Sequence, residues 1–598
     1  MELDYALVHV KFTIPLALLL TVVAKPFITT LDVTRITFLV AVAVSATIPW
    51  DSYLIRSGVW TYPAGGVLGY SLVDIPCEEL FFFVVQTYIT GVLYVMCSKP
   101  VLLAQYLPAP SVGDSKTEDE GCGRQGWTRK ARAIGQVALV SLTAWGALLI
   151  RAGGRGTYLG LILAWACPFL FITWSLTGEM ILSMPWPATV LPIAIPTVYL
   201  WLVDELSLRS GIWTIEDGTK LGVSLFGSLD VEEALFFFLT NTLVVFGIAA
   251  FDQAAAACDA FPELFPRPAD DLPVRELLMA RVCPTPRYDG RRVRAVREAV
   301  GRLSRKSRSF YIASSVFPGR VRIDLSLLYS YCRLADDLVD EASSPGEARS
   351  WITKLKQHID LSYRATITAS ASADTRSFIR TNFPPSARTA LEVLPSRILS
   401  PESLYSLLDG FATDLEFRDD CGLGAPISDE ADLELYASRV ASTVGALCLD
   451  VVLHHTRRTD DDSAATLYAA AKEMGVALQY INIARDVEVD AAMGRVYLPT
   501  TWLSEEGLTP GEAVARPRGP AIEGLRKRLL GKAFLRYRAS RKALELLPRS
   551  VRGAMTVAVE SYMEIGRVLA EGGLRVEGKA TVPAWRRMWV VWKTLVLS

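Results

Sequence analysis

Residues 479–499, QYINIARDVEVDAAMGRVYLP, decide the fold of the C-terminal half of the chain. If this stretch is helical to about Ala492, then Gln479, Asn482, Asp486 and Asp490 recur at steps of three, four and four and form one polar stripe. Two carboxylates four residues apart on one helix face repel each other, so the pair needs a compensating cation. The stretch therefore predicts a helix that carries a cation site.

A second acidic pair of the same kind lies earlier, in YCRLADDLVD at 331–340. Asp336 and Asp340 are again four residues apart, and each of the two pairs has a neighbouring arginine, Arg333 or Arg485. Mg²⁺ takes one or two carboxylates and completes its shell with water and substrate phosphate, while arginine binds phosphate oxygens. One such pair alone is usually a solvated helix face, but two pairs with arginines favour a site for Mg²⁺ and a diphosphate.

The charged residues divide the chain into two unlike parts. Residues 1–250 contain 14 Lys/Arg and 19 Asp/Glu, whereas the remaining 348 residues contain 48 and 44. A formal net charge of −1 over 598 residues excludes a globally basic nucleic-acid-binding protein, and the sequence shows no dense basic patch with interleaved aromatic residues, so we expect no nucleic-acid partner. The nine cysteines show no CxxC spacing, which argues against a zinc site or a disulfide framework. We therefore expect a membrane half, residues 1–251, joined to a soluble half.

Seven apolar runs in the first half approach the roughly 20 residues that a bilayer requires. They are residues 4–24, 34–51, 78–98, 133–151, 157–177, 187–205 and 231–251. If the N-terminus lies outside, the inside loops hold eight Lys/Arg and the outside loops five. This excess predicts a multi-pass protein whose second half is cytosolic. Scattered cysteines and a charge-rich second half that faces the cytosol are consistent with an endomembrane.

An internal repeat runs through the membrane half. WDSYLIRSGVWTYP at 50–63 returns as VDELSLRSGIWTIE at 203–216, and PCEELFFF at 76–83 returns as DVEEALFF at 230–237. The matched pairs are Asp51 with Asp204, Arg56 with Arg209, Trp60 with Trp213, Glu78 with Glu232 and Glu79 with Glu233. Two three-span units, about 1–98 and 157–251, then have the same orientation, which puts both acidic pairs on one membrane face.

The four repeated glutamates, Glu78, Glu79, Glu232 and Glu233, are candidate catalytic residues because acidic groups at the end of an apolar span are costly. The alternative is an interfacial cap, since acidic residues in a first helical turn complement the helix dipole. Duplication in register with Asp, Arg and Trp favours catalysis. A carboxyl group beside aromatic rings can act as a general acid, and the rings can stabilise a carbocation. The set suits protonation of an alkene followed by cyclisation.

At these residues the chain resembles the membrane-type carotenoid cyclases, in which two homologous three-span units form a lycopene β-cyclase. The resemblance covers about residues 1–250 and rests on the LIRSGVWTY and PxEExxFF patterns, although Asp230 stands in the second repeat where the first has Pro76. It implies conversion of the ends of lycopene, or of related acyclic carotenes, to β-rings. We expect no cofactor for this reaction, and the glutamate that donates the proton stays open.

The remaining chain predicts a linker and a helical domain. Residues 252–288 are rich in Ala, Pro and Asp, which is typical of a semi-rigid linker. Residues 289–598 show helical periodicity almost throughout and predict a soluble domain around a central cavity. The fold class expected for the whole chain is all-α.

Five ordered motifs make the second half similar to the squalene/phytoene synthase family over about residues 290–598. They are SRSFY (307–311), YCRLADDLVD (331–340), DGFATDL (409–415), YASRVASTVG (436–445) and the opening stretch. The resemblance implies head-to-head condensation of two geranylgeranyl diphosphates to phytoene through a cyclopropyl diphosphate. It also implies that Mg²⁺ (or Mn²⁺) is held with the diphosphates by Asp336, Asp340, Asn482, Asp486 and Asp490.

The same resemblance assigns ten residues to substrate binding. They are Ser307, Ser309, Phe310, Tyr311, Arg333, Asp414, Gln479, Asn482, Arg485 and Arg495. For Asp414 an ordinary surface salt bridge with Arg418, four residues later, is an equal alternative.

Two functions for the whole chain compete. In the first, one polypeptide carries a carotene cyclase and a phytoene synthase, acts on geranylgeranyl diphosphate, lycopene and other acyclic carotenes, and has the lipid bilayer and other carotenoid-pathway enzymes as candidate partners. In the second, a monofunctional phytoene or squalene synthase carries a non-catalytic membrane anchor or a carotenoid-binding module. The paired glutamates of both repeats favour the first, because a bare anchor does not need them.

Overall fold

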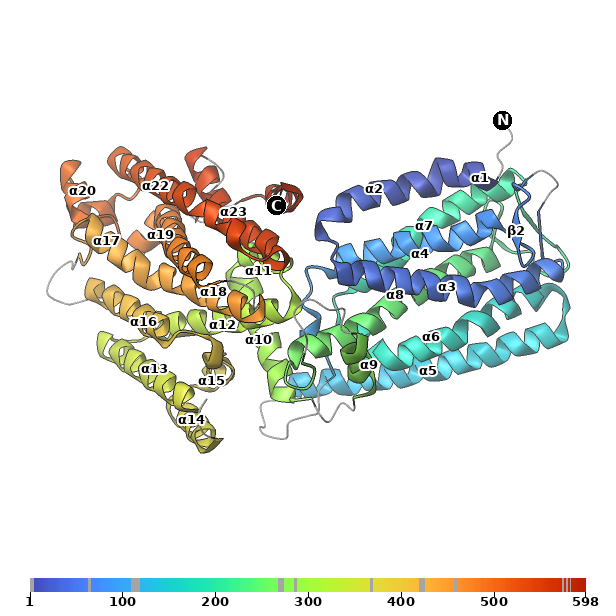
Figure 1. Cartoon of the computed structure of the whole chain (residues 1–598), viewed down its shortest axis with the longest axis horizontal. Coiled ribbons are helices and arrows are strands. Elements are labelled where there is room, and N and C mark those ends of the chain that lie inside the picture. The colour runs from blue at the N-terminus through green and yellow to red at the C-terminus, as the bar shows by residue number, and fades with distance from the viewer. Residues whose placement is uncertain are drawn as a thin grey trace. The chain divides into compact units, whose positions relative to one another are not determined.

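A computed structural model of the chain shows two compact units, Met1–Gly290 and Arg291–Ser598, in which helices predominate (Figure 1). The structure describes residues 5–62, 66–108, 119–266, 274–283, 288–365, 369–418, 425–456, 460–572, 575–576, 579–580 and 582–597. The strands within these ranges have two or three residues each. The expected all-α class is therefore confirmed.

The first unit is a bundle of long helices that run side by side (Figure 1). Its helices are α1 (Tyr5–Val8), η1 (His9–Thr13), α2 (Ile14–Ala24), η2 (Lys25–Phe27), α3 (Thr30–Arg56), α4 (Cys77–Ser98), η3 (Leu103–Tyr106), α5 (Asp119–Ala152), η4 (Gly154–Gly156), α6 (Thr157–Ser183), α7 (Trp186–Arg209), α8 (Val231–Ala260) and α9 (Val274–Val282). The segments from α1 to η2 are continuous, with one π-helical turn at η1.

Long apolar helices coincide with the seven predicted runs. Within the described residues, eight helical segments are long and apolar enough to cross a membrane. Seven belong to the first unit: Tyr5–Phe27, Thr30–Arg56, Cys77–Ser98, Gly126–Ala152, Gly154–Ser183, Trp186–Arg209 and Val231–Ala260. The eighth, Glu430–Thr456, lies in the second unit. The apolar helices of the first unit indicate membrane association.

The repeated RSG sequence ends α3 and α7 in the same way. Gly58 and Gly211 follow these helices with φ of 66° and 69°, a left-handed conformation that glycine adopts without steric cost. The chain then enters β1 (Trp60–Thr61) and β4 (Thr214–Ile215), which pair antiparallel with Thr61 opposite Thr214. The two threonine hydroxyls lie 2.8 Å apart and are separated by 153 residues, so the repeats meet at matching positions.

Short hairpins deliver the two acidic pairs. β2 (Ser71–Leu72) pairs with β3 (Ile75–Pro76) immediately before α4, and β5 (Ser224–Phe226) pairs with β6 (Leu229–Asp230) immediately before α8. Each hairpin therefore places one Glu-Glu pair in the first turn of an apolar helix.

The predicted linker at 252–288 is partly helical and lies inside the first unit. Helix α8 continues to Ala260 because the alanine-rich run after Asp252 favours a helix. Asp252 is buried, pairs with Arg35 and accepts a hydrogen bond from the Tyr94 hydroxyl at 3.0 Å. Helix α9 is attached by Arg281, which donates to the side chain of Gln253 at 2.7 Å.

The second unit is a helical domain with two hydrophobic clusters. Its elements are α10 (Gly290–Lys306), α11 (Arg308–Ser314), α12 (Gly319–Asp340), α13 (Pro345–Ala365), α14 (Ala369–Asn382), α15 (Pro385–Glu392), η6 (Ser396–Ile398), α16 (Pro401–Leu415), η7 (Glu416–Arg418), α17 (Glu430–Ala437), η8 (Ser438–Ser442), α18 (Thr443–Thr456), α19 (Asp461–Ala492), α20 (Thr500–Glu505), α21 (Pro510–Ala515), α22 (Pro520–Ser540), η9 (Arg541–Leu546), α23 (Arg549–Ala570), β7 (Arg575–Val576), β8 (Lys579–Ala580) and α24 (Ala584–Leu597). One cluster centres on α12, α13, α16 and α18, and the other on α19, α22 and α23.

Candidate active sites

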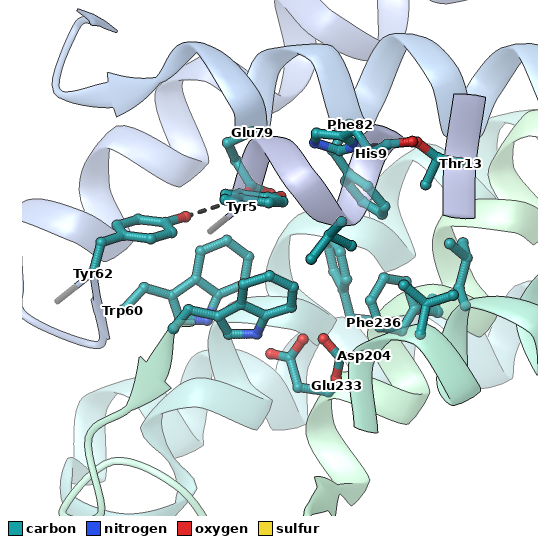
Figure 2. Close-up of a pocket in the computed structure, with 15 residues that line it drawn as sticks. Tyr5, His9, Thr13, Trp60, Tyr62, Glu79, Phe82, Asp204, Glu233 and Phe236 are labelled. Atoms are coloured by element: carbon teal, nitrogen blue, oxygen red, sulfur yellow. Dashed lines mark hydrogen bonds between the residues drawn. The ribbon is translucent and has the colours of Figure 1, made fainter. Parts of the chain in front are cut away.

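A pocket in the first unit lies between the two repeats and is lined by a glutamate from each (Figure 2). Glu79 comes from the first turn of α4 and Glu233 from the first turn of α8. Figure 2 shows Glu79 with Tyr5 and Tyr62 on one side of the pocket and Glu233 with Asp204 on the other. The structure thus brings together one glutamate from each of the two Glu-Glu pairs that the repeat contains.

Each pocket glutamate accepts a hydrogen bond from a tyrosine at a matching position of the repeat. The Tyr5 hydroxyl donates to Glu79 Oε2 at 2.6 Å, and the Tyr158 hydroxyl donates to Glu233 Oε1. Tyr5 and Tyr158 are 153 residues apart, which is the spacing of the matched threonines. The repeat therefore includes a tyrosine–glutamate pair that the sequence motifs did not contain.

The other glutamate of each pair holds a loop instead. Glu78 Oε1 accepts the backbone N–H of Leu68 at 2.6 Å, and Glu232 Oε1 accepts that of Leu221 at 2.7 Å. Neither helix has a side-chain cap hydrogen bond, and all four glutamates are buried. Burial and partners of this kind differ from those of an exposed interfacial cap.

Two further carboxyl groups, those of Asp51 and Asp204, adjoin the pocket. They are 0% and 2% exposed, and the Trp213 side chain lies against the carboxyl group of Asp204. Both lie within electrostatic range of Glu79 and Glu233. Because several buried carboxylates close to one another are costly, a cluster of this kind is suited to hold protons and deliver them.

Aromatic rings form the walls of this pocket. Phe82, Phe236 and Phe237 line it together with Trp60 and Trp213. The rings of Phe82 and Phe237 are 5.9 Å apart and edge to face. Phe81 and Phe238, which are next to these phenylalanines in the sequence, do not line the pocket and are 40% and 45% exposed. Electron-rich ring faces beside carboxyl groups can stabilise a cation that those groups create.

The pocket is small, with a volume of about 40 Å³. Sites for small molecules usually have about 300–1,000 Å³. A substrate can therefore enter only if side chains move, and a substrate end that does enter is kept from water.

The second unit contains a larger cavity of about 310 Å³ between its two hydrophobic clusters. Phe310 of α11, Tyr329 of α12, Gln479 and Asn482 of α19 and Tyr562 of α23 line it. Most of the remaining lining is aliphatic, and the Tyr562 hydroxyl donates to Asn482 Oδ1. The central cavity expected from the sequence is confirmed.

The two acidic motifs stand at the C-terminal ends of α12 and α19, where arginines hold them. Arg333 pairs with Asp336 at 2.8 Å, and Arg485 pairs with Asp486 through two hydrogen bonds of 2.9 and 2.5 Å. Each motif therefore has the arginine partner that its sequence indicated.

Arg495 connects the two motifs. Its guanidinium pairs with Asp340 Oδ1 at 2.9 Å, and its backbone N–H donates to the Asp490 carbonyl at 2.8 Å. The side chain of Arg495 is 6% exposed and that of Asp340 is 37% exposed, so only the arginine is shielded from water. One residue thus holds the end of α12 close to the turn that follows α19.

The carboxyl groups at this end of the unit are crowded. Burial raises the pKa of Asp336 to about 7, although Arg333 opposes the shift, and Asp340 and Asp414 raise it further. Burial likewise raises the pKa of Asp414 to about 6. A cation bound nearby would stabilise the ionised form of such carboxyl groups.

Asp414 is buried rather than part of a surface salt bridge. It is 8% exposed, and its two oxygens accept hydrogen bonds from the hydroxyls of Tyr497 at 2.8 Å and Tyr436 at 3.3 Å. The side chain of Arg418 lies outside the described residues. The surface alternative is wrong because the tyrosines enclose the carboxyl group.

The donor chemistry of the acidic motifs fits a magnesium ion. All candidate ligands are oxygens, which Mg²⁺ prefers, and it needs only one or two protein carboxylates beside water and phosphate. Within the described residues no three acidic, histidine or cysteine side chains are close enough to form a ready-made metal cage. The acidic motifs therefore suit an ion that is also coordinated by the phosphate oxygens of a substrate.

The remaining residues assigned to substrate binding lie around α11. Ser307 and Ser309 stand at its start. Phe310 lines the cavity, with its ring 5.1 Å from that of Tyr562. Tyr311 instead packs beside Arg322, whose guanidinium carbon is 6.0 Å from the ring centre.

Comparison with known proteins identifies both units together. A family model described as squalene/phytoene synthase matches residues 303–587. Relatives named bifunctional lycopene cyclase/phytoene synthase align along the whole chain: that of Colletotrichum graminicola is 54% identical over 606 residues and that of Podospora anserina 51% over 603, each covering 100% of both chains. That of Neurospora crassa is 49% identical over 604 residues and covers 98% of both.

The chain belongs to the bifunctional lycopene cyclase/phytoene synthase family. The resemblances of both halves are thereby confirmed, and the alternative of a monofunctional synthase with a non-catalytic anchor is not favoured.

The sequence did not indicate which tyrosines contact the carboxyl and amide groups of the two sites. Tyr5 and Tyr158 fall outside the repeated motifs, although a search at the repeat spacing finds them. Tyr562 lies 80 residues along the chain from the Asn482 amide that it contacts. Tyr436 opens the motif at 436–445, but that motif did not indicate its contact with Asp414. Nothing in their local sequence signals those partners.

Proposed function

We propose that the second unit condenses two molecules of geranylgeranyl diphosphate head-to-head to phytoene through a cyclopropyl diphosphate. The observation that carries this proposal is an aliphatic cavity that leads to two acidic motifs with their own arginines. Prenyl chains would occupy the cavity, which excludes water from a carbocation. Arg333, Arg485 and Arg495 would bind phosphate oxygens when their carboxylate partners turn to a metal.

The metal site proposed for this reaction consists of Asp336, Asp340, Asn482, Asp486 and Asp490. Mg²⁺ (or Mn²⁺) bound there would neutralise the negative charge of the departing diphosphate. The proximity of Asp336, Asp340 and Asp414 supports this site, since uncompensated carboxylates repel each other.

For the first unit we propose proton-initiated cyclisation of lycopene, or of related acyclic carotenes, to β-rings. The supporting observation is a small pocket that carboxyl groups and aromatic rings line together. Among the four predicted glutamates the geometry favours Glu79 and Glu233, because Glu78 and Glu232 hold loops. The aromatic walls would stabilise the cyclising cation.

The topology proposed for this unit is seven spans in two three-span repeats, with the second unit cytosolic. The seven apolar helices and the pairing of Thr61 with Thr214 support it. Lycopene and phytoene are apolar, so a synthase attached to a membrane would release its product where the later pathway enzymes work.

Two matched variants of the full-length chain in membranes test both proposals. Asp486→Asn should abolish phytoene formation from geranylgeranyl diphosphate and leave lycopene cyclisation intact, and Glu233→Gln should do the reverse. Loss of both activities in either variant, in folded protein, would contradict separate sites. Retention of cyclisation in Glu233→Gln and in Glu79→Gln would remove the pocket from the mechanism.

A further inference from the structure

The two glutamates in the pocket of the first unit stand in unlike surroundings, although the repeat places them at matching positions. Three polar residues of the first repeat line this pocket and correspond, at the spacing of 153 residues, to apolar residues of the second. The pairs are His9 with Ile162, Thr13 with Ala166, and Tyr62 with Ile215. At these three positions the first repeat therefore carries polar groups where the second repeat carries apolar ones.

Hydrogen bonds show the same asymmetry. Glu79 Oε2 accepts two phenolic O–H groups, from Tyr5 at 2.6 Å and from Tyr62 at 3.1 Å. Glu233 accepts the one from Tyr158, and the position that matches Tyr62 is Ile215, which is 5% exposed. Donors directed at a carboxyl oxygen stabilise its ionised form, so Glu79 is better prepared than Glu233 to exist as a carboxylate.

We infer that Glu233 is the general acid and Glu79 the general base of the cyclisation, and that Tyr62 is the positioning residue that separates these roles. This inference rests on the proposed cyclase function. Tyr5 and Tyr158 are matched residues of the two repeats, so the hydrogen bonds that they donate do not distinguish the two glutamates. Tyr62 can, because the second repeat has no hydroxyl at its position.

The assigned roles account for every proton and electron pair. The Glu233 carboxyl group gives its proton to the terminal C1=C2 double bond of lycopene, at C2, which leaves a cation at C1. The electrons of the C5=C6 double bond form the C1–C6 bond and leave a cation at C5. Glu79 then removes the proton from C6, and those electrons restore C5=C6 in the ring. Exchange of both glutamates with water resets the pair, and no oxidant or reductant is needed.

Deuterated water separates the two roles. Full-length protein in membranes is supplied with lycopene in deuterated water, and both the rings and the remaining lycopene are analysed for deuterium. The parent chain should give β-rings that carry solvent deuterium. If it gives no ring, the proposed cyclase function itself fails.

The two glutamine variants should then differ in kind. Glu233→Gln should lose ring formation by about 100-fold or more and leave the remaining lycopene free of deuterium, because no cation forms. Glu79→Gln should lose rings to a similar extent but incorporate deuterium into the remaining lycopene, because the cation forms and returns. The opposite pattern, or deuterium in neither variant, would overturn the assignment while the parent result keeps the cyclase function.

Tyr62→Phe tests the positioning role without removing the ring of the side chain. It should lower kcat for ring formation about tenfold, leave KM for lycopene unchanged, and raise the deuterium in unreacted lycopene. Tyr70→Phe, at a tyrosine that is 74% exposed, is the matched control. Phytoene formation by the same preparations corrects each rate for the amount of full-length chain with a folded second unit. Unchanged kcat in Tyr62→Phe would show that this hydroxyl does not separate the two roles.

Discussion

Replacing Gly475 by alanine tests how closely α19 must pack against the π turn η8. A Cβ at this position would lie 2.5 Å from Ser442 Cα, 2.6 Å from Ser442 N and 2.8 Å from the carbonyl carbon of Ala441. Carbon atoms in contact prefer about 3.5–4.0 Å, so the two elements must separate by about 1 Å. The atoms in the way are backbone, which has no alternative rotamer.

The expected loss of stability follows from two opposing terms. Overpacking costs about 1–3 kcal/mol, and the better helix propensity of alanine returns up to about 1 kcal/mol. We expect a net loss of about 1–2 kcal/mol, which corresponds to a Tm lower by about 2–6 °C. Because Gly475 lines the cavity one helical turn before Gln479, the shift should also raise KM for geranylgeranyl diphosphate.

The assay follows phytoene formation by the full-length chain after heating at a series of temperatures. Gly524→Ala is the matched control, because this glycine lies in α22, is exposed and has no atom within 4 Å of the place that an added methyl group would take. It should stabilise the second unit by up to about 1 kcal/mol. If Gly475→Ala inactivates at the same temperature as Gly524→Ala and keeps the parent KM, the packing argument is refuted.

Three further predictions concern divalent ions, Tyr497 and His358. Chelation of divalent ions should stop phytoene formation and leave lycopene cyclisation unchanged in the same membranes, so loss of both activities would contradict a metal site confined to the second unit. Tyr497→Phe, which removes the 2.8 Å donor to buried Asp414, should destabilise the synthase unit by about 1–3 kcal/mol; an unchanged inactivation temperature would show that the bond contributes nothing. Burial lowers the pKa of His358 to about 4. Between pH 6.5 and pH 4 the histidine is therefore neutral in the folded chain, whereas in the unfolded chain it binds a proton. Stability should therefore fall by up to about 3 kcal/mol as the pH drops from 6.5 to 4, and His358→Gln should flatten that dependence in thermal inactivation at pH 5 and pH 7.

The pattern of charge and hydrophobicity was sufficient for the architecture of the chain. Apolar runs placed the helices of the first unit, and helical periodicity placed those of the second. Proline and aspartate suggested a connector at 252–288, whereas α8 continues to Ala260 and Asp252 forms a buried pair with Arg35. A long-range ion pair is invisible to a local pattern.

The acidic motifs and the duplicated glutamates follow from the sequence by itself, because spacing along a helix fixes which side chains share a face. Only the tertiary structure separates Glu79 from Glu78, since neighbouring residues on a helix point about 100° apart and packing decides which one faces a pocket. It also supplied Tyr5, 74 residues from Glu79, and Tyr497, 83 residues from Asp414. Contacts over such distances depend on how whole helices pack, and no local sequence pattern encodes them.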